Sequence, residues 1–205
     1  MSKTVTPLSP QELIRLLTAA RAHSVRDWAM FLTGYLHAMR ASEIGNLRLA
    51  DVDIQTGHIR IARLKGSLMT VQAIEKHRGI PILDEQKALR EWLAIRPTDC
   101  GDAPFTGKKS GRLSRSQIFR LFQQYATEIG LPEGRRHVHL LKHSLCSHLV
   151  RQGVHLARVQ IAAGHRSISS TMKYTHLTDG DADVSRQAAL MSMDWARGAA
   201  AGSGL

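Results

Sequence analysis

The sequence contains 205 residues, enough for one sizeable globular domain or two small ones. With 28 Lys and Arg against 17 Asp and Glu, its net charge of +11 favours a polyanionic partner, which by composition alone could be DNA, RNA or an acidic membrane. Two cysteines cannot form a disulfide framework, and no secretory signal or apolar run of the roughly 20 residues that a membrane span needs is present, so we expect a cytoplasmic protein.

The first predicted helix begins at a capping box. Ser9 stands at the N-cap, Pro10 at the first helical position and Glu12 three residues after the cap. Apolar residues then recur at helical spacing to about residue 22, and a second helix is predicted over 25–39. Only eight residues precede the first cap, so we expect no further domain at the N-terminus.

The pattern then changes to the alternation that is typical of strands. Residues 58–64 predict a strand, residues 65–67 a turn, and residues 68–74 the returning strand of a hairpin. Residues 79–83 predict a short edge strand, because Pro81 cannot donate to a central ladder. These segments predict one small antiparallel sheet.

Helical spacing resumes after the sheet and is interrupted by a loop over 96–112. The chain is therefore predicted to be mainly α with a small antiparallel β-sheet (α+β). We expect a single domain over 1–197 and a flexible tail over 198–205. The remaining predicted helices are 84–95, 114–129, 140–152, 156–162, 167–175 and 183–196.

Three short stretches carry residues suited to phosphodiester chemistry: Arg-Ala-Ser-Glu at 40–43, His-Leu-Leu-Lys-His at 139–143, and Gly-His at 164–165 with Tyr174 beyond it. In order and spacing they resemble the signature of the tyrosine recombinase (phage integrase) family, and the short form found in fimbrial phase-variation invertases. Lys142 and His165 are 23 residues apart, and Tyr174 follows His165 by nine residues. The ordered set is specific and spans nearly the whole chain, whereas a Gly-His pair alone would be weak.

The resemblance implies a catalytic pocket in which Tyr174 attacks a DNA phosphate. Metal-free cleavage requires cations around the nonbridging oxygens, and the guanidinium of Arg40 offers phosphate a bidentate fork. His165 would donate to the same phosphate, and His139 is the candidate general base. Lys65, at the tip of the predicted hairpin, would protonate the departing 5′ oxygen. Taken alone, each residue has an ordinary alternative as a surface cation, a satisfied histidine or a packed tyrosine.

One position departs from the family pattern, because Lys142 stands where the second arginine is expected. A lysine keeps the positive charge but loses the bidentate geometry, and a lost transition-state donor costs on the order of 3 kcal/mol. Either the pocket has adjusted to an ammonium group, or the protein binds DNA without exchanging strands. We favour activity because the other positions of the set are intact.

Further charged residues have predicted supporting roles. By resemblance, Glu43 orients the pocket and His143 packs beside the second motif. The histidines and the cysteine between residues 137 and 148 would also suit zinc, but no carboxylate joins them, so we expect neither a metal nor another cofactor. The expected DNA contacts are Arg63, Arg112, Arg115, Arg135, Arg136, Arg166 and Lys173.

The resemblance also implies partners. Tyr174 would form a 3′-phosphotyrosyl bond and free a 5′ hydroxyl, which attacks the partner strand's phosphotyrosine within a tetramer on two double-stranded DNA sites at the nucleoid. The chain corresponds to the catalytic part alone, so we expect the N-terminal core-binding domain to be absent. An apolar face near the C-terminus would join neighbouring protomers or pack within its own chain; it comprises Leu190, Met191, Met193 and Trp195.

Other classes of function stay open. A noncatalytic or weakly active DNA-binding regulator derived from this family would fit Lys142 and the absent domain. A type IB topoisomerase or a hairpin telomere resolvase would use the same pocket chemistry. An RNA-binding module finds no RNP or KH motif in the sequence.

Overall fold

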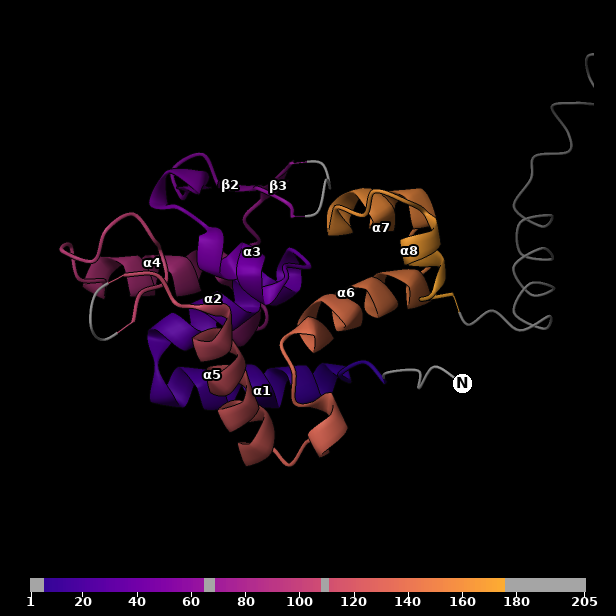
Figure 1. Cartoon of the computed structure of the whole chain (residues 1–205), viewed down its shortest axis with the longest axis horizontal. Coiled ribbons are helices and arrows are strands. Elements are labelled where there is room, and N and C mark those ends of the chain that lie inside the picture. The colour runs from indigo at the N-terminus through magenta and orange to yellow at the C-terminus, as the bar shows by residue number, and fades with distance from the viewer. Residues whose placement is uncertain (1–5, 65–68, 108–110, 176–205) are drawn as a thin grey trace, which may run out of the picture. The chain divides into compact units, whose positions relative to one another are not determined.

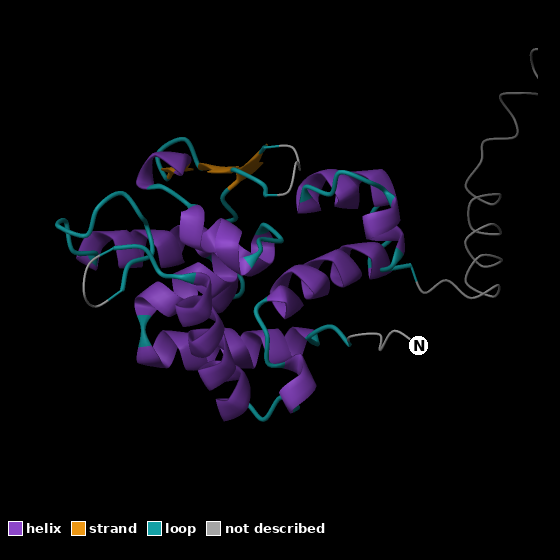
Figure 2. Ribbon diagram, viewed as in Figure 1, coloured by secondary structure: helices purple, strands orange, loops and turns teal. Residues whose placement is uncertain are grey.

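The computed structural model describes residues 6–64, 69–107 and 111–175, which are mainly helical with one small sheet (Figures 1 and 2). The predicted fold class is confirmed. Contacts divide the chain into a unit up to Tyr174 and a second unit from Thr175 onward, almost all of which lies outside the described residues. The predicted helix over 183–196 and the tail also lie outside them.

The N-terminal helices follow the capping signals of the sequence. Helix α1 spans Pro10–His23, and its predicted capping box is confirmed by reciprocal hydrogen bonds between Ser9 and Glu12. Helix α2 spans Val25–Leu36 and ends earlier than predicted. The reason is Ala38, whose φ of 48° lies in the left-handed region, where a helix cannot continue.

The sheet is antiparallel with the order β1-β2-β3, and the predicted hairpin is confirmed. Strand β2 (His58–Ile61) pairs with β3 (Thr70–Ala73). The third strand is not the predicted segment 79–83, where Pro81–Leu83 instead form a 3-10 helix, η2. It is β1 (Val52–Asp53), which pairs with β2 through the short turn between them.

The main core lies between α1, α2, α4, α5 and the buried face of the sheet. Trp28 is fully buried and donates from its indole to the carbonyl of Ile82 (2.9 Å). The Tyr125 hydroxyl donates to buried Asp27 (2.6 Å), so this buried carboxylate is paired. The remaining elements are α3 (Ala41–Asn46), η1 (Leu49–Asp51), α4 (Glu85–Ile95), α5 (Arg115–Glu128), η3 (Glu133–Arg135), α6 (His139–Arg151), α7 (Leu156–Ala163) and α8 (Ser169–Met172).

A second, smaller core forms where α6, α7 and the end of α8 meet. Helix α6 packs against both α2 and α7, and α7 contacts β3, so the end of α2, the hairpin and the end of α7 converge (Figure 1). Helix α8 is shorter than the predicted 167–175. Within the described part of the chain, no helix is long and apolar enough to cross a membrane.

Candidate active site

The turn after α2 presents Arg40. The backbone N–H of Arg40 donates to Oε2 of Glu43 (2.9 Å), and its guanidinium donates to Oε1 (2.6 Å), while about a quarter of the Arg40 side chain remains exposed (27 %). Burial alone would raise the pKa of the Glu43 carboxyl. The hydrogen bonds from Arg40 and the charges of Lys142 and Arg63 outweigh it, so the pKa is lowered and Glu43 stays ionised. The predicted orienting partner therefore contacts Arg40 directly.

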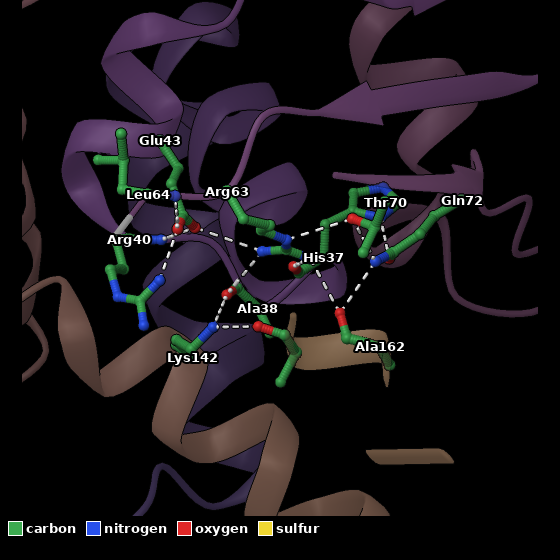
Figure 3. Close-up of polar contacts among 11 residues, drawn as sticks. His37, Ala38, Arg40, Glu43, Arg63, Leu64, Thr70, Gln72, Lys142 and Ala162 are labelled. Atoms are coloured by element: carbon green, nitrogen blue, oxygen red, sulfur yellow. Dashed lines mark hydrogen bonds and ion pairs between the residues drawn. The ribbon is translucent and has the colours of Figure 1, made fainter. Parts of the chain in front are cut away.

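Arg63 is buried, in contrast to the predicted DNA contact. Its guanidinium has five N–H donors, and all five are taken by protein acceptors (Figure 3). DNA could therefore bind this group only at the cost of existing hydrogen bonds. The period-two alternation of β2 carried the missed signal, because it places Arg63 on the same face as buried Ile59 and Ile61.

Lys142 is also inside the protein, with 1 % of its surface exposed. Its ammonium group donates to the carbonyl oxygens of Ala38 (2.8 Å) and Ala163 (2.5 Å) (Figure 3). Burial, reinforced by the charge of Arg63 and opposed by Glu43, lowers the pKa of Lys142 to about 8. In this structure the residue that replaces the family's second arginine joins two backbone segments.

His165 follows the left-handed Gly164 that ends α7. Nδ1 of His165 lies 2.9 Å from the hydroxyl oxygen of Thr171, in a hydrogen bond that fixes the ring. Removal from water and the charges of Lys142 and Lys173 lower the pKa of His165 to about 4. His139, at the start of α6, has its pKa lowered to about 4 by the same kinds of cause, although its side chain is more exposed. Both rings are neutral near pH 7.

Tyr174 lies in the smaller core with 3 % of its surface exposed. Its ring stacks on that of His165, with centroids 6.2 Å apart and planes inclined by 8°. Its hydroxyl is buried beside the thiol of Cys146. Burial, together with Cys146, raises the pKa of this phenol well above its usual value of 10. The candidate nucleophile is therefore held protonated and away from solvent.

A cavity of about 410 Å³ lies between the start of α3, α5 and the start of α6, and Tyr174 and His165 are not among the residues that line it. Arg40 and His139 line it together with Arg115, so three predicted site residues from separate segments face one space. Two further lining residues, Ser42 and His137, were not among the predicted catalytic or DNA-binding residues. Burial lowers the pKa of His137. The cavity therefore offers cationic and hydrogen-bonding groups.

The other predicted DNA contacts differ in their surroundings. Arg115, Arg166 and Lys173 are exposed, and the ammonium of Lys173 lies 5.2 Å from the centre of the Tyr174 ring. Arg112 donates to Asp102 (2.7 Å) and to two backbone carbonyls near α3. The two remaining arginines are tied to the protein: Arg135 donates to Glu12, Thr6 and Pro7, and Arg136 to the carbonyl of Leu131.

Two predictions are not resolved by these contacts. Lys65 lies outside the described residues. The ring of His143 lies 5.1 Å from that of Tyr174, which agrees with a packing role. Among the described residues, no group of three or more His, Cys, Asp or Glu side chains is placed to hold a metal ion.

Comparison with known proteins supplies independent evidence. The model of the phage integrase family matches residues 7–181. Type 1 fimbriae regulatory protein FimE of Escherichia coli (strain K12) is 33% identical over 158 residues, which are 75% of this chain and 76% of FimE. FimB of the same strain is 33% identical over 174 residues, or 82% of each chain. Tyrosine recombinase XerC of Roseiflexus castenholzii is 32% identical over 187 residues, 86% of this chain and 56% of XerC.

Solved structures show the same fold at lower identity. The crystal structure of XerA recombinase matches with a TM-score of 0.74 and 24% identity, over 95% of this chain and 68% of that chain. XerH site-specific recombinase bound to its difH substrate matches with a TM-score of 0.72 and 21% identity, over 90% of this chain and 55% of that chain.

Proposed function

Because the chain belongs to the phage integrase family and is a tyrosine recombinase, we propose that it cleaves and rejoins double-stranded DNA at a specific site through Tyr174. The observation that supports assigning the reaction to these residues is the stacking of Tyr174 on His165. Arg40 and Lys142, from two other segments, lie close to this pair. Spacing in the sequence is thereby matched by proximity in the fold.

The proposed reaction is an exchange of phosphate esters. The Tyr174 oxygen attacks phosphorus and forms a 3′-phosphotyrosyl bond, while the bond to the 5′ oxygen breaks and that oxygen takes up a proton from Lys65. Arg40 and His165 donate to the nonbridging oxygens, and His139 accepts the phenol proton. The freed 5′ hydroxyl of the partner strand then reverses the step, so ester bonds are conserved and no ATP is consumed.

The buried position of Tyr174 represents the resting enzyme in this proposal. Its hydroxyl must leave the neighbourhood of Cys146 before it can attack a phosphate in the cavity beside Arg40. The phosphate brings negative charge to a site with excess positive charge, so DNA binding itself favours the arrangement in which phenol and phosphate meet.

A nicked suicide substrate, made from the DNA that flanks the gene, tests this function. The wild-type chain should form a covalent protein–DNA adduct that disappears in Tyr174→Phe. A noncatalytic DNA-binding regulator is the second candidate, favoured by the engagement of Lys142 with two carbonyls. Binding of the site by wild type without any adduct would support the regulator and exclude the recombinase.

We further propose that four protomers assemble on two DNA sites at the nucleoid in the cytoplasm. Supporting this, an apolar cavity of about 710 Å³ lies on the surface of the described unit, between α1, the end of α2 and α6. Its volume suits the apolar side chains of a helix from a neighbouring copy, such as the C-terminal face around Leu190 and Trp195. Leu13, Leu36, Leu145 and Leu149 contribute to its lining.

A further inference from the structure

The guanidinium of Arg63 connects four separate segments of the chain (Figure 3). One N–H donates to the hydroxyl of Thr70 on β3 (3.2 Å) and another to Glu43 on α3 (3.3 Å). Two donate to the carbonyls of His37 (2.9 Å) and Ala38 (3.2 Å) in the turn before Arg40. The fifth is bound by Ala162 at the end of α7.

Lys142, on α6, also connects the turn before Arg40 with the end of α7. It shares the Ala38 carbonyl with Arg63 and binds Ala163, the neighbour of Ala162. The last carbonyls of a helix carry partial negative charge, so the end of α7 is a favourable place for two cations. The turn before Arg40 and the end of α7 are therefore held together by two independent positive groups.

The amide of Gln72 adds the hairpin to this arrangement. Its nitrogen donates to the Ala162 carbonyl (2.9 Å), and its oxygen lies 2.8 Å from Nδ1 of His37. His37 is paired in turn with buried Glu85 (3.0 Å). The side chains that donate to the carbonyls of Ala162 and Ala163 come from the hairpin segment, as Arg63 and Gln72, and from α6, as Lys142.

From these contacts we infer that Arg63 is a positioning residue for DNA cleavage, which holds Arg40 at the correct distance from His165 without touching DNA. The inference rests on the proposed recombinase function. Arg40 follows the bound carbonyls of residues 37 and 38, and His165 follows that of Ala162 by three residues. A shift of either segment moves a donor away from the scissile phosphate, and misplacement by about 1 Å costs about a hundredfold in rate.

The closing experiment separates positioning from DNA binding. Arg63→Met and Arg63→Lys are compared with Arg60→Met, a control three residues earlier, on β2, whose side chain is exposed. Single-turnover adduct formation at saturating nicked DNA should fall about a hundredfold in Arg63→Met and less in Arg63→Lys, at unchanged DNA affinity. Arg60→Met should weaken affinity or leave it unchanged, with the saturating rate intact.

Two outcomes overturn the inference. One is a loss in Arg63→Lys that appears in DNA affinity while the saturating rate is retained, which makes Arg63 a DNA ligand. The other is a lowered melting temperature of the Arg63 variants with an unchanged saturating rate, which makes Arg63 merely structural. If Arg63→Met fails to fold, Arg63→Lys decides between these results.

Failure of the proposed function is recognised separately. If the wild type itself forms no adduct, the recombinase assignment fails, and amide hydrogen exchange then decides the inference in the DNA-free protein. Faster exchange in Arg63→Lys than in Arg60→Met, at both 37–40 and 162–165, supports the joining role. Equal exchange in the two variants overturns it.

Discussion

At the scale of single residues, Lys142 differs from the arginine expected at its position mainly in how easily it loses its proton. A lysine donates to two carbonyls as well as an arginine does, but unlike arginine it can lose its proton near the working pH. Its pKa of about 8 means that its charged form is already reduced in mildly basic solution. The substitution within the family motif therefore has a pH dependence that an arginine would not have.

We predict that wild-type cleavage falls relative to Lys142→Arg as the pH rises from about 7 to about 9. Lys142 loses its proton in this range, whereas the arginine stays charged. The measurement is the rate of adduct formation at each pH, taken as a ratio so that the ionisation of Tyr174 cancels. A ratio that stays constant would show that the charge of Lys142 is not needed.

The two neutral histidines give a second prediction at this scale. A bound phosphate raises the pKa of His139 and His165 from about 4, because an adjacent anion stabilises the imidazolium. DNA binding near pH 6 should therefore take up protons, which calorimetry in buffers of different ionisation enthalpy measures. The uptake should shrink in His165→Gln but not in His58→Gln, an exposed control; equal uptake in all three proteins would contradict it.

The lowered pKa values of His139 and His165 also determine how the stability of the DNA-free protein changes with pH. The folded pKa of each ring lies below its ordinary value of 6.5, so the unfolded chain binds more protons between about pH 4 and 6.5. Thermal stability is therefore lost as the pH falls through this window. Since His139 is largely exposed, most of the change should arise from His165.

At the scale of elements, the end of α7 depends on Gly164. Its φ of 62° is left-handed, and a Cβ there would lie 2.8 Å from the Arg63 side chain. Gly153 has a similar φ of 75° but nothing within 4 Å of a Cβ. Substitution of either glycine strains the backbone, but only substitution of Gly164 also displaces the Arg63 side chain.

We predict that Gly164→Ala lowers the free energy of unfolding by about 1–3 kcal/mol and abolishes most cleavage. Gly153→Ala should be destabilised by strain alone and cleave normally. Urea unfolding and adduct formation are measured for both variants. Normal cleavage by Gly164→Ala would show that the contact between residues 63 and 164 is not required.

The helices and the hairpin could be predicted from the sequence more accurately than the short strand β1, the end of α2 and the burial of individual side chains. A capping box, helical spacing and alternation are local signals, and the elements predicted from them, α1, α5 and the hairpin, are confirmed. Strand β1 has only two residues, too short for any periodic pattern, and the end of α2 depends on the unusual φ of Ala38. The motif residues His165 and Tyr174 lie side by side, as do Arg40 and Glu43. The burial of Lys142 and Tyr174 depends on packing of distant segments, which spacing does not contain.

At the scale of the whole molecule, we predict that a substitution in the apolar cavity beside α6 disrupts assembly of protomers without preventing DNA binding. Leu149→Asp places a charge in the cavity lining and should prevent the docking of a neighbouring copy. Binding of one protomer to a half-site should remain, because the cationic cavity beside Arg40 is a different surface.

Sedimentation of the protein on a full DNA site measures the effect. We expect the wild type to assemble as a multimer and Leu149→Asp to bind as single protomers. Trp195→Asp should give the same result if the C-terminal segment is the occupant. Assembly that survives Leu149→Asp but not Trp195→Asp would place the docking surface elsewhere.

The burial of the Tyr174 hydroxyl also has a consequence for unwanted DNA cleavage. A free chain meets long stretches of unrelated DNA, yet the hydroxyl of Tyr174, the proposed nucleophile, is protonated and buried beside Cys146. Under the proposed mechanism, a chain free of DNA would therefore not nick DNA, and neither an inhibitor nor a second protein would be needed to prevent it. In the proposed assembly on DNA, cleavage would begin only once Tyr174 has left this buried position.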